Sequence, residues 1–180
     1  MKTASVIATL ILLTAITIAV GSRDAVAQSA AQTRDIPQSL RVEHEDTLEQ
    51  LTTLSKRRTA VGAEARKALA LFKKHIQREE EYILPPLTLL PDLADGKITP
   101  DMKWAIAMAD RVKAEREQIF LEHTQITDAM NALATAARQA HDVDALHFAQ
   151  SAVADSLNDI ELLEPMTMVI GDYLRAKLPQ

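Results

Sequence analysis

The chain has 180 residues and a formal net charge of −5, which is enough length for one domain with a core of its own. Hydrophobic residues make up 47% of it, but aromatic residues only 3%, and this composition favours packed helices over a sandwich or barrel of strands. Acidic and basic residues are interspersed, which argues against a nucleic-acid-binding surface. Without cysteine there are no disulfides and no thiol chemistry, so any metal must be bound mainly by His, Asp and Glu.

The first 27 residues are predicted to form a signal peptide. Lys2 precedes an uncharged apolar run over residues 4–21, and Ala25-Val26-Ala27 matches the small-x-small pattern of a cleavage site. Cleavage after Ala27 would make the protein periplasmic or secreted, with a disordered leader of small and polar residues at 28–34. The alternative is an uncleaved membrane anchor, because the apolar run approaches the length that spans a bilayer.

Residues 35–177 are predicted to be all-α and to form an antiparallel, up-down four-helix bundle. Asp35 and Pro37 provide the chemistry of a helix start, Pro85 ends the second helix, and Pro165 is expected to kink or break the fourth. A linker is expected over residues 87–100. The predicted helices cover residues 35–56, 59–84, 101–138 and 142–177.

The two halves of this region repeat each other weakly. Glu43-His44 recurs 79 residues later as Glu122-His123, and Pro85 recurs 80 residues later as Pro165. Two copies of one helical hairpin would therefore build the bundle. In the register of the prolines, residue 75 corresponds to residue 155 and residue 79 to residue 159.

Polar side chains on the apolar stripes of the helices indicate a metal site. His44 lies on the stripe of the first helix, and His75 and Glu79 lie one turn apart on that of the second, at similar heights in the bundle. A single inward histidine such as His123 is more often a hydrogen-bonded core residue than a ligand. An unpaired inward carboxylate is costly, however, and a metal cation offsets that cost. His141 and His147 are expected at the surface.

The inward face of the fourth helix has two readings in the sequence. A line through Phe148, Asp155 and Asp159 directs both acids inward. A second line, through Leu146 and Val153, leaves Asp155 outside. The periodicity does not choose between them.

Residues 75–85 (HIQREEEYILP) resemble the HxxxE segment, ending in a proline, of the hemerythrin-like HHE family. Glu43-His44 and Glu122-His123 match the first- and third-helix histidines of that family, and the resemblance covers about residues 36–175. It implies non-haem iron, often as a di-iron pair, held inside an up-down bundle. It also implies roles in binding dioxygen or nitric oxide, in sensing, or in iron handling.

The second HxxxE segment of the family appears here as residues 155–159 (DSLND), without its histidine. Asp159 keeps a carboxylate where the family has one, whereas Asp155 replaces a neutral nitrogen donor with a shorter anion. A second histidine on the third helix is also missing, which argues against a reversible dioxygen carrier. Such a site, mononuclear or dinuclear, suits Fe, Mn or Zn. The implied metal ligands are His44, His75, Glu79, His123, Asp159 and, as the weaker candidate, Asp155.

The expected function is binding, sensing or storage rather than enzymatic turnover. A ferritin-like redox enzyme is the second candidate, but it needs Glu-x-x-His pairs, and none follows residue 27. A b-type haem bundle would use His and Met ligands, but no methionine lies between residue 28 and Met102. The main alternative is a structural or interaction bundle whose metal site has decayed.

Overall fold

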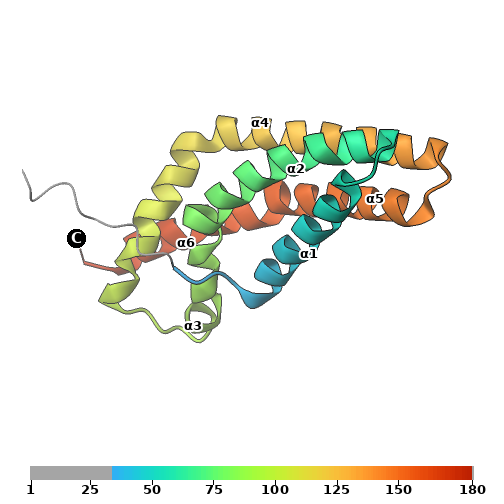
Figure 1. Cartoon of the computed structure of the whole chain (residues 1–180). Helices are drawn as coiled ribbons and strands as arrows, with labels where there is room; N and C mark the ends of the chain where they lie inside the picture. The colour runs from blue at the N-terminus through green and yellow to red at the C-terminus, as the bar shows by residue number, and fades with distance from the viewer. Residues whose placement is uncertain (1–33, 180) are drawn as a thin grey trace, which may run out of the picture. The chain divides into compact units, whose positions relative to one another are not determined.

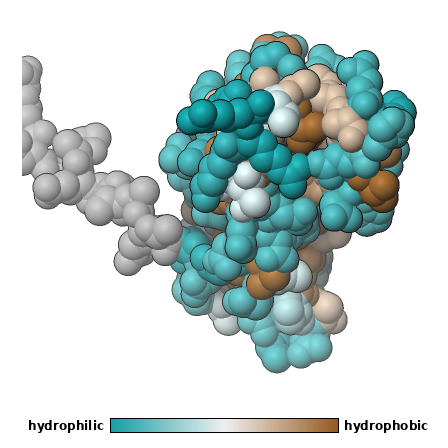
Figure 2. Space-filling model, turned by 45° about the vertical axis from the view of Figure 1, so that its right-hand side comes forward, coloured by the Kyte–Doolittle hydropathy of each residue, from teal (hydrophilic) through white to brown (hydrophobic). Residues whose placement is uncertain are grey.

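A computed structural model describes residues 34–179. The predicted signal peptide, and nearly all of the predicted leader, lie outside these residues. Within them every regular element is a helix, which confirms the predicted all-α class. No helix in this range is both long enough and apolar enough to cross a membrane. The face drawn in Figure 2 is accordingly mostly hydrophilic, with hydrophobic residues in small groups.

Five helices provide most of the structure, and a sixth, α3 (Leu90–Ala94), is a single short turn. Thr59 caps the second of the five, because its hydroxyl accepts a hydrogen bond from the amide of Gly62 at 3.3 Å. Asp35 does not cap the first as predicted; that helix follows Pro37, and the Asp35 carboxylate lies 3.6 Å from Arg41 instead. The five are α1 (Gln38–Ser55), α2 (Ala60–Arg78), α4 (Trp104–Gln139), α5 (Val143–Asn158) and α6 (Glu164–Lys177).

The long helices lie side by side (Figure 1). A short turn reverses the chain between α1 and α2, and another reverses it between α4 and α5. α2 packs against α1 and α4, while α4 packs along α5 and then along α6. The predicted linker at 87–100 is more ordered than expected, since 3-10 turns and α3 cover most of it and Leu87 is buried.

Two π-helical turns occur at equivalent places in the two halves. One (Glu79–Ile83) extends α2, and the other (Asp159–Leu163) joins α5 to α6. In each, an amide bonds to the carbonyl five residues earlier, as between Leu84 and Glu79 at 2.8 Å. This spacing gives the 80-residue repeat a structural counterpart.

The prolines explain both π turns. Pro85 and Pro165 each follow a π turn by two residues. A proline ring collides with the carbonyl four residues earlier in a regular α-helix, and a wider turn removes that collision. Pro165 therefore widens the path from α5 to α6 without ending it.

The apolar core has two parts, one on each side of the predicted metal level. Ile126 and Met130 belong to the part near the α1–α2 turn, and Ile119 and Val112 belong to the other. His123 lies between these two pairs along α4. A polar layer at the level of the histidines therefore separates the two apolar cores.

Candidate metal centre

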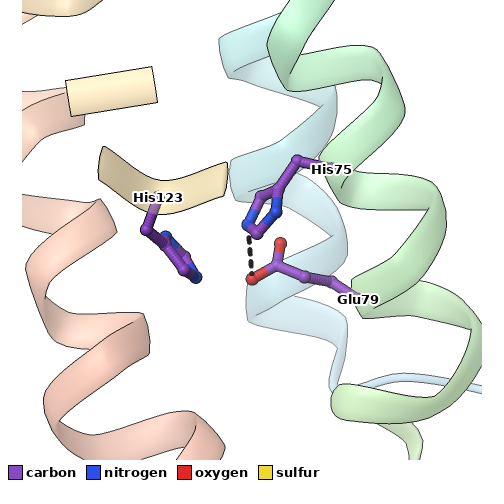
Figure 3. A group of neighbouring side chains, drawn as sticks. All are labelled: His75, Glu79 and His123. Atoms are coloured by element: carbon purple, nitrogen blue, oxygen red, sulfur yellow. Dashed lines mark ion pairs between the residues drawn. The ribbon is translucent and has the colours of Figure 1, made fainter. Parts of the chain in front are cut away.

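His75, Glu79 and His123 meet between α2 and α4 (Figure 3). Their exposed fractions are 2%, 1% and 1%, so all three are inside the protein. His75 Nε2 lies 3.2 Å from Glu79 Oε1, and the rings of His75 and His123 are 4.3 Å apart between centroids. One ligand atom of each residue lies within 4.8 Å of the others, so this group can hold a metal ion.

His44 reaches the same group from α1. It is buried, as predicted, and its Nε2 lies 3.2 Å from Glu79 Oε2. Glu79 thus presents one carboxylate oxygen to His75 and the other to His44. A carboxylate in this position can act as a ligand through either oxygen, for one metal ion or for two.

Glu164, the first residue of α6, belongs to the site although the sequence did not point to it. It is only 4% exposed, and its Oε1 lies 3.0 Å from His123 Nε2. Counting helical turns from Asp159 directs Leu163 inward, but the π turn adds one residue and brings Glu164 to that side. Pro165, which causes the wider turn, was the available signal.

Four ligand atoms of the site lie close together without hydrogen-bond geometry. They are buried, and within residues 34–179 none of them has a hydrogen-bond partner. Leaving such an atom unpaired costs about 1–3 kcal/mol. A cation between them would remove that cost. The four atoms are His75 Nε2, Glu79 Oε1, His123 Nε2 and Glu164 Oε1.

Each histidine is held by a polar partner at its other ring nitrogen. Histidines that bind metals usually direct the second nitrogen to such a partner, which fixes the orientation of the ring. All three rings consequently turn Nε2 towards a carboxylate of the site. The Nδ1 partners are Glu80 for His44 (3.0 Å), Glu122 for His75 (3.5 Å) and Ser156 for His123 (3.0 Å).

None of these partners was predicted. Glu122 is itself fixed, since it accepts hydrogen bonds from Gln118 at 3.0 Å and from Arg78 at 3.2 Å. Burial opposes its ionisation, but the hydrogen bond from Gln118 and the charge of Arg78 lower the pKa of Glu122. His75 therefore faces an ionised carboxylate on both sides.

Protons occupy the site in the absence of metal. Burial disfavours a charge on His44, but its hydrogen bond to Glu79 raises the pKa of His44 to about 9. Burial likewise opposes ionisation of Glu79, yet the charge of His75 and the hydrogen bond from His44 lower the pKa of that carboxyl. A cation entering the site would displace these protons, because metal-binding histidines are neutral.

The two aspartates of the fourth predicted helix differ in position. Asp159 is half-buried, and burial together with the charges of Glu79 and Glu43 raises its pKa to about 8. Asp155 is exposed, one turn earlier. The buried face of α5 passes through Phe148, Ala149, Ala152 and Ser156, so it includes Phe148 from the first predicted line and leaves Asp155 outside, as in the second. His141 and His147 are exposed, as predicted.

A small cavity adjoins the histidines. Residues of α1, α2, α4 and α5 line it, including the three histidines, Asp155 and Asp159. Its volume is about 20 Å3, room for about one water molecule. An organic substrate would not fit, whereas an ion or a very small ligand would.

Comparisons of the chain with models of protein families, with curated proteins and with solved structures found no match. The resemblance to the hemerythrin-like family therefore rests on the motifs quoted from the sequence. The metal-binding capacity of the site rests on the positions of its side chains.

Proposed function

We propose that this protein is an exported, hemerythrin-like four-helix bundle that binds non-haem iron in its core. The observation that carries the proposal is a group of four buried ligand atoms without hydrogen-bond partners within residues 34–179, in two close pairs at 3.2 and 3.0 Å. Imidazole and carboxylate together suit Fe, Mn or Zn, and the motif in residues 75–85 favours iron. The proposed ligands are His44, His75, Glu79, His123, Asp159 and Glu164.

The carboxylates of the site and the apolar cores around it determine which chemistry the metal centre supports. Iron would supply a Lewis-acidic, redox-active centre for a small ligand such as dioxygen or nitric oxide. Glu79, Asp159 and Glu164 supply negative charge, and a donor set rich in carboxylates favours hard cations. The packed core on both sides excludes bulk water. These features support binding, sensing or storage of iron rather than turnover of an organic substrate.

The alternative is a structural bundle whose metal site has decayed, and Asp155 in place of a histidine motivates it. Such a bundle would keep these four buried atoms in ion pairs that lack hydrogen-bond geometry. It would also keep three histidines oriented by Nδ1 partners without a ligand on the other side. The unpaired atoms and the oriented rings favour metal binding.

Metal content tests the proposal. After reconstitution of the mature protein with ferrous iron under anaerobic conditions, we expect stoichiometric iron in the wild type by atomic emission spectrometry. His75→Ala and His123→Ala should each weaken binding by more than about a hundredfold, beyond the loss typical of outer partners. His147→Ala, an exposed histidine of α5, is the matched control and should bind normally.

Parallel loading with Mn2+ and Zn2+ identifies the preferred metal. A wild-type protein that retains none of the three metals would refute metal binding and favour the decayed bundle. Equal losses in His147→Ala and His75→Ala would show that the effect is not local to the site.

Export makes a separate prediction. Because Ala25-Val26-Ala27 fits a cleavage site, the periplasmic protein should have the intact mass of a chain that begins at Gln28. Mass spectrometry of the periplasmic and membrane fractions measures this. A product that retains Met1 and is found in membranes would instead indicate an anchor.

A further inference from the structure

We propose that the cavity beside the histidines is the passage by which a divalent cation reaches the buried ligands, with Glu43 and Asp155 as its acidic mouth. This inference rests on the proposed metal binding and adds the route of entry to it. The lining residues change from outside to inside: Asp155 is exposed, Glu43 and Asp159 are half-buried, and His75 is buried. Polar ligand groups therefore extend along the cavity from the solvent to the site.

The apolar cores close the approach along the helix axes. Ile119 and Ile126 flank His123 on α4, and they are 0% and 3% exposed. They belong to the two separate cores, and closely packed apolar side chains exclude a hydrated ion. A cation must therefore enter from the side of the bundle.

The seam between α1 and α5 is the loosest side. Within residues 34–179, α1 packs against α2 and has few contacts with α5, whereas α4 packs extensively with both α2 and α5. The cavity lies at this seam, lined by Glu43 and His44 from α1, by Asp155 from α5 and by Asp159 from the π turn that follows α5. One acid of the mouth thus comes from each side of the seam.

Behind the acids of the mouth lie buried ligand atoms without hydrogen-bond partners in the described part of the chain. This distinguishes the mouth from an ordinary acidic patch. His75 and His123 also line the cavity, they are 2% and 1% exposed, and their Nε2 atoms have no hydrogen-bond partner within residues 34–179. Once they release their protons, imidazole nitrogens bind metal cations and not anions. The volume of about 20 Å3 admits one water-sized particle at a time.

The mouth should affect the rate of metal binding and leave the amount of iron bound at saturation unchanged. Negative charge at the entrance of a low-dielectric cavity raises the encounter rate of cations by about 10- to 1,000-fold. Glu43 and Asp155 lie outside the proposed ligand set, so the bound ion does not need them. The same charge would hinder anionic ligands such as azide.

Uptake kinetics of ferrous iron test the passage. Metal-free mature protein is mixed anaerobically with Fe2+, and excess ferrous chelator added at intervals traps the iron that is still free. For the double variant Glu43→Gln/Asp155→Asn we expect about tenfold slower uptake at low ionic strength. The difference should shrink at about 0.5 M salt, where exposed charges are screened, and the iron bound at equilibrium should stay unchanged.

A matched control removes the same charge away from the mouth. Glu45→Gln/Asp46→Asn changes two exposed acids of α1 that do not line the cavity, and it should take up iron at the wild-type rate. Equal rates in both double variants, whether normal or slowed, would overturn the passage and leave the metal centre standing. Lower equilibrium iron in Glu43→Gln/Asp155→Asn would also overturn it, because the two acids would then be ligands. A wild type that binds no iron would refute the proposed function itself.

Discussion

Replacing Glu79 with glutamine is expected to lower the free energy of unfolding of the metal-free protein by about 3–5 kcal/mol at pH 7, because removing one partner of a buried ion pair leaves the others without a counter-charge. Glu79 is 1% exposed and faces the Nε2 atoms of His44 and His75, both at 3.2 Å. A neutral amide cannot balance these histidines. Urea denaturation followed by the fluorescence of Trp104, the only tryptophan, measures the change.

The pH dependence of this loss follows from the two pKa values. The pKa of Glu79 is lowered from 4.5, so its contribution is present above about pH 4.5 and is lost as the pH falls further. The pKa of His44 is raised from 6.5 to about 9, so its contribution is complete below pH 6.5 and is lost as the pH rises through 9. The difference between wild type and Glu79→Gln should therefore be largest between pH 4.5 and 6.5.

The control is Glu81→Gln, two residues further along the chain. Glu81 is exposed and pairs with Arg111 at the surface, so its loss should cost less than about 1 kcal/mol. An equal loss in both variants would contradict the central position given to Glu79. So would a difference between wild type and Glu79→Gln that stays constant from pH 5 to pH 10.

Regular helical periodicity was sufficient to predict the first half of the site. His75 lies on α2, and Glu79 directly follows its last residue with its amide still bonded to the His75 carbonyl, so the two share a face wherever that helix begins. The height of His44 could be counted because α1 is also regular. The first helix was predicted to start three residues too early. This error did not affect the predicted level of His44, because three residues correspond to less than one helical turn.

The second half could not be predicted in the same way, because its geometry is not regular. The π turn before Pro165 adds a residue and directs Glu164 inward, where a period of 3.6 does not place it. Apart from Phe148, the buried face of α5 consists of small residues, and a search for large apolar side chains does not select Ser156. Both the wider turn and the burial of small side chains depend on tertiary packing, which the hydrophobic periodicity of the sequence does not reveal.

The partners at the Nδ1 atoms depend on contacts between helices far apart in the sequence. Glu122 comes from α4 to His75 on α2, and Ser156 comes from α5 to His123. Neither is distinguishable in the sequence from an ordinary surface acid or a small helix residue. His44, His75 and Glu79 could be inferred from local spacing, whereas the groups that orient the histidines required the fold.

Asp159→Asn is expected to have opposite effects on the stability of the metal-free protein and on its affinity for metal. Burial and the charges of Glu79 and Glu43 raise the pKa of Asp159 from 3.8 to about 8. A carboxyl whose pKa is raised by folding costs stability as the pH rises from its unfolded to its folded pKa, here from about 4 to about 8. Asparagine carries no charge, so the metal-free variant should be more stable than wild type by on the order of 2 kcal/mol at pH 8, and no more stable at pH 4.

Metal binding should reverse this order. The same substitution removes the negative charge of a proposed ligand, so iron affinity should fall by at least about tenfold, the smallest loss typical of groups around a metal. Thermal unfolding with and without iron at pH 8 measures both effects: iron should raise the melting temperature of the wild type much more than that of Asp159→Asn. Asp155→Asn, one turn earlier and exposed, is the control and should change both quantities little. If Asp155→Asn matches Asp159→Asn, or if iron stabilises Asp159→Asn as much as wild type, the carboxylate of Asp159 is not a ligand.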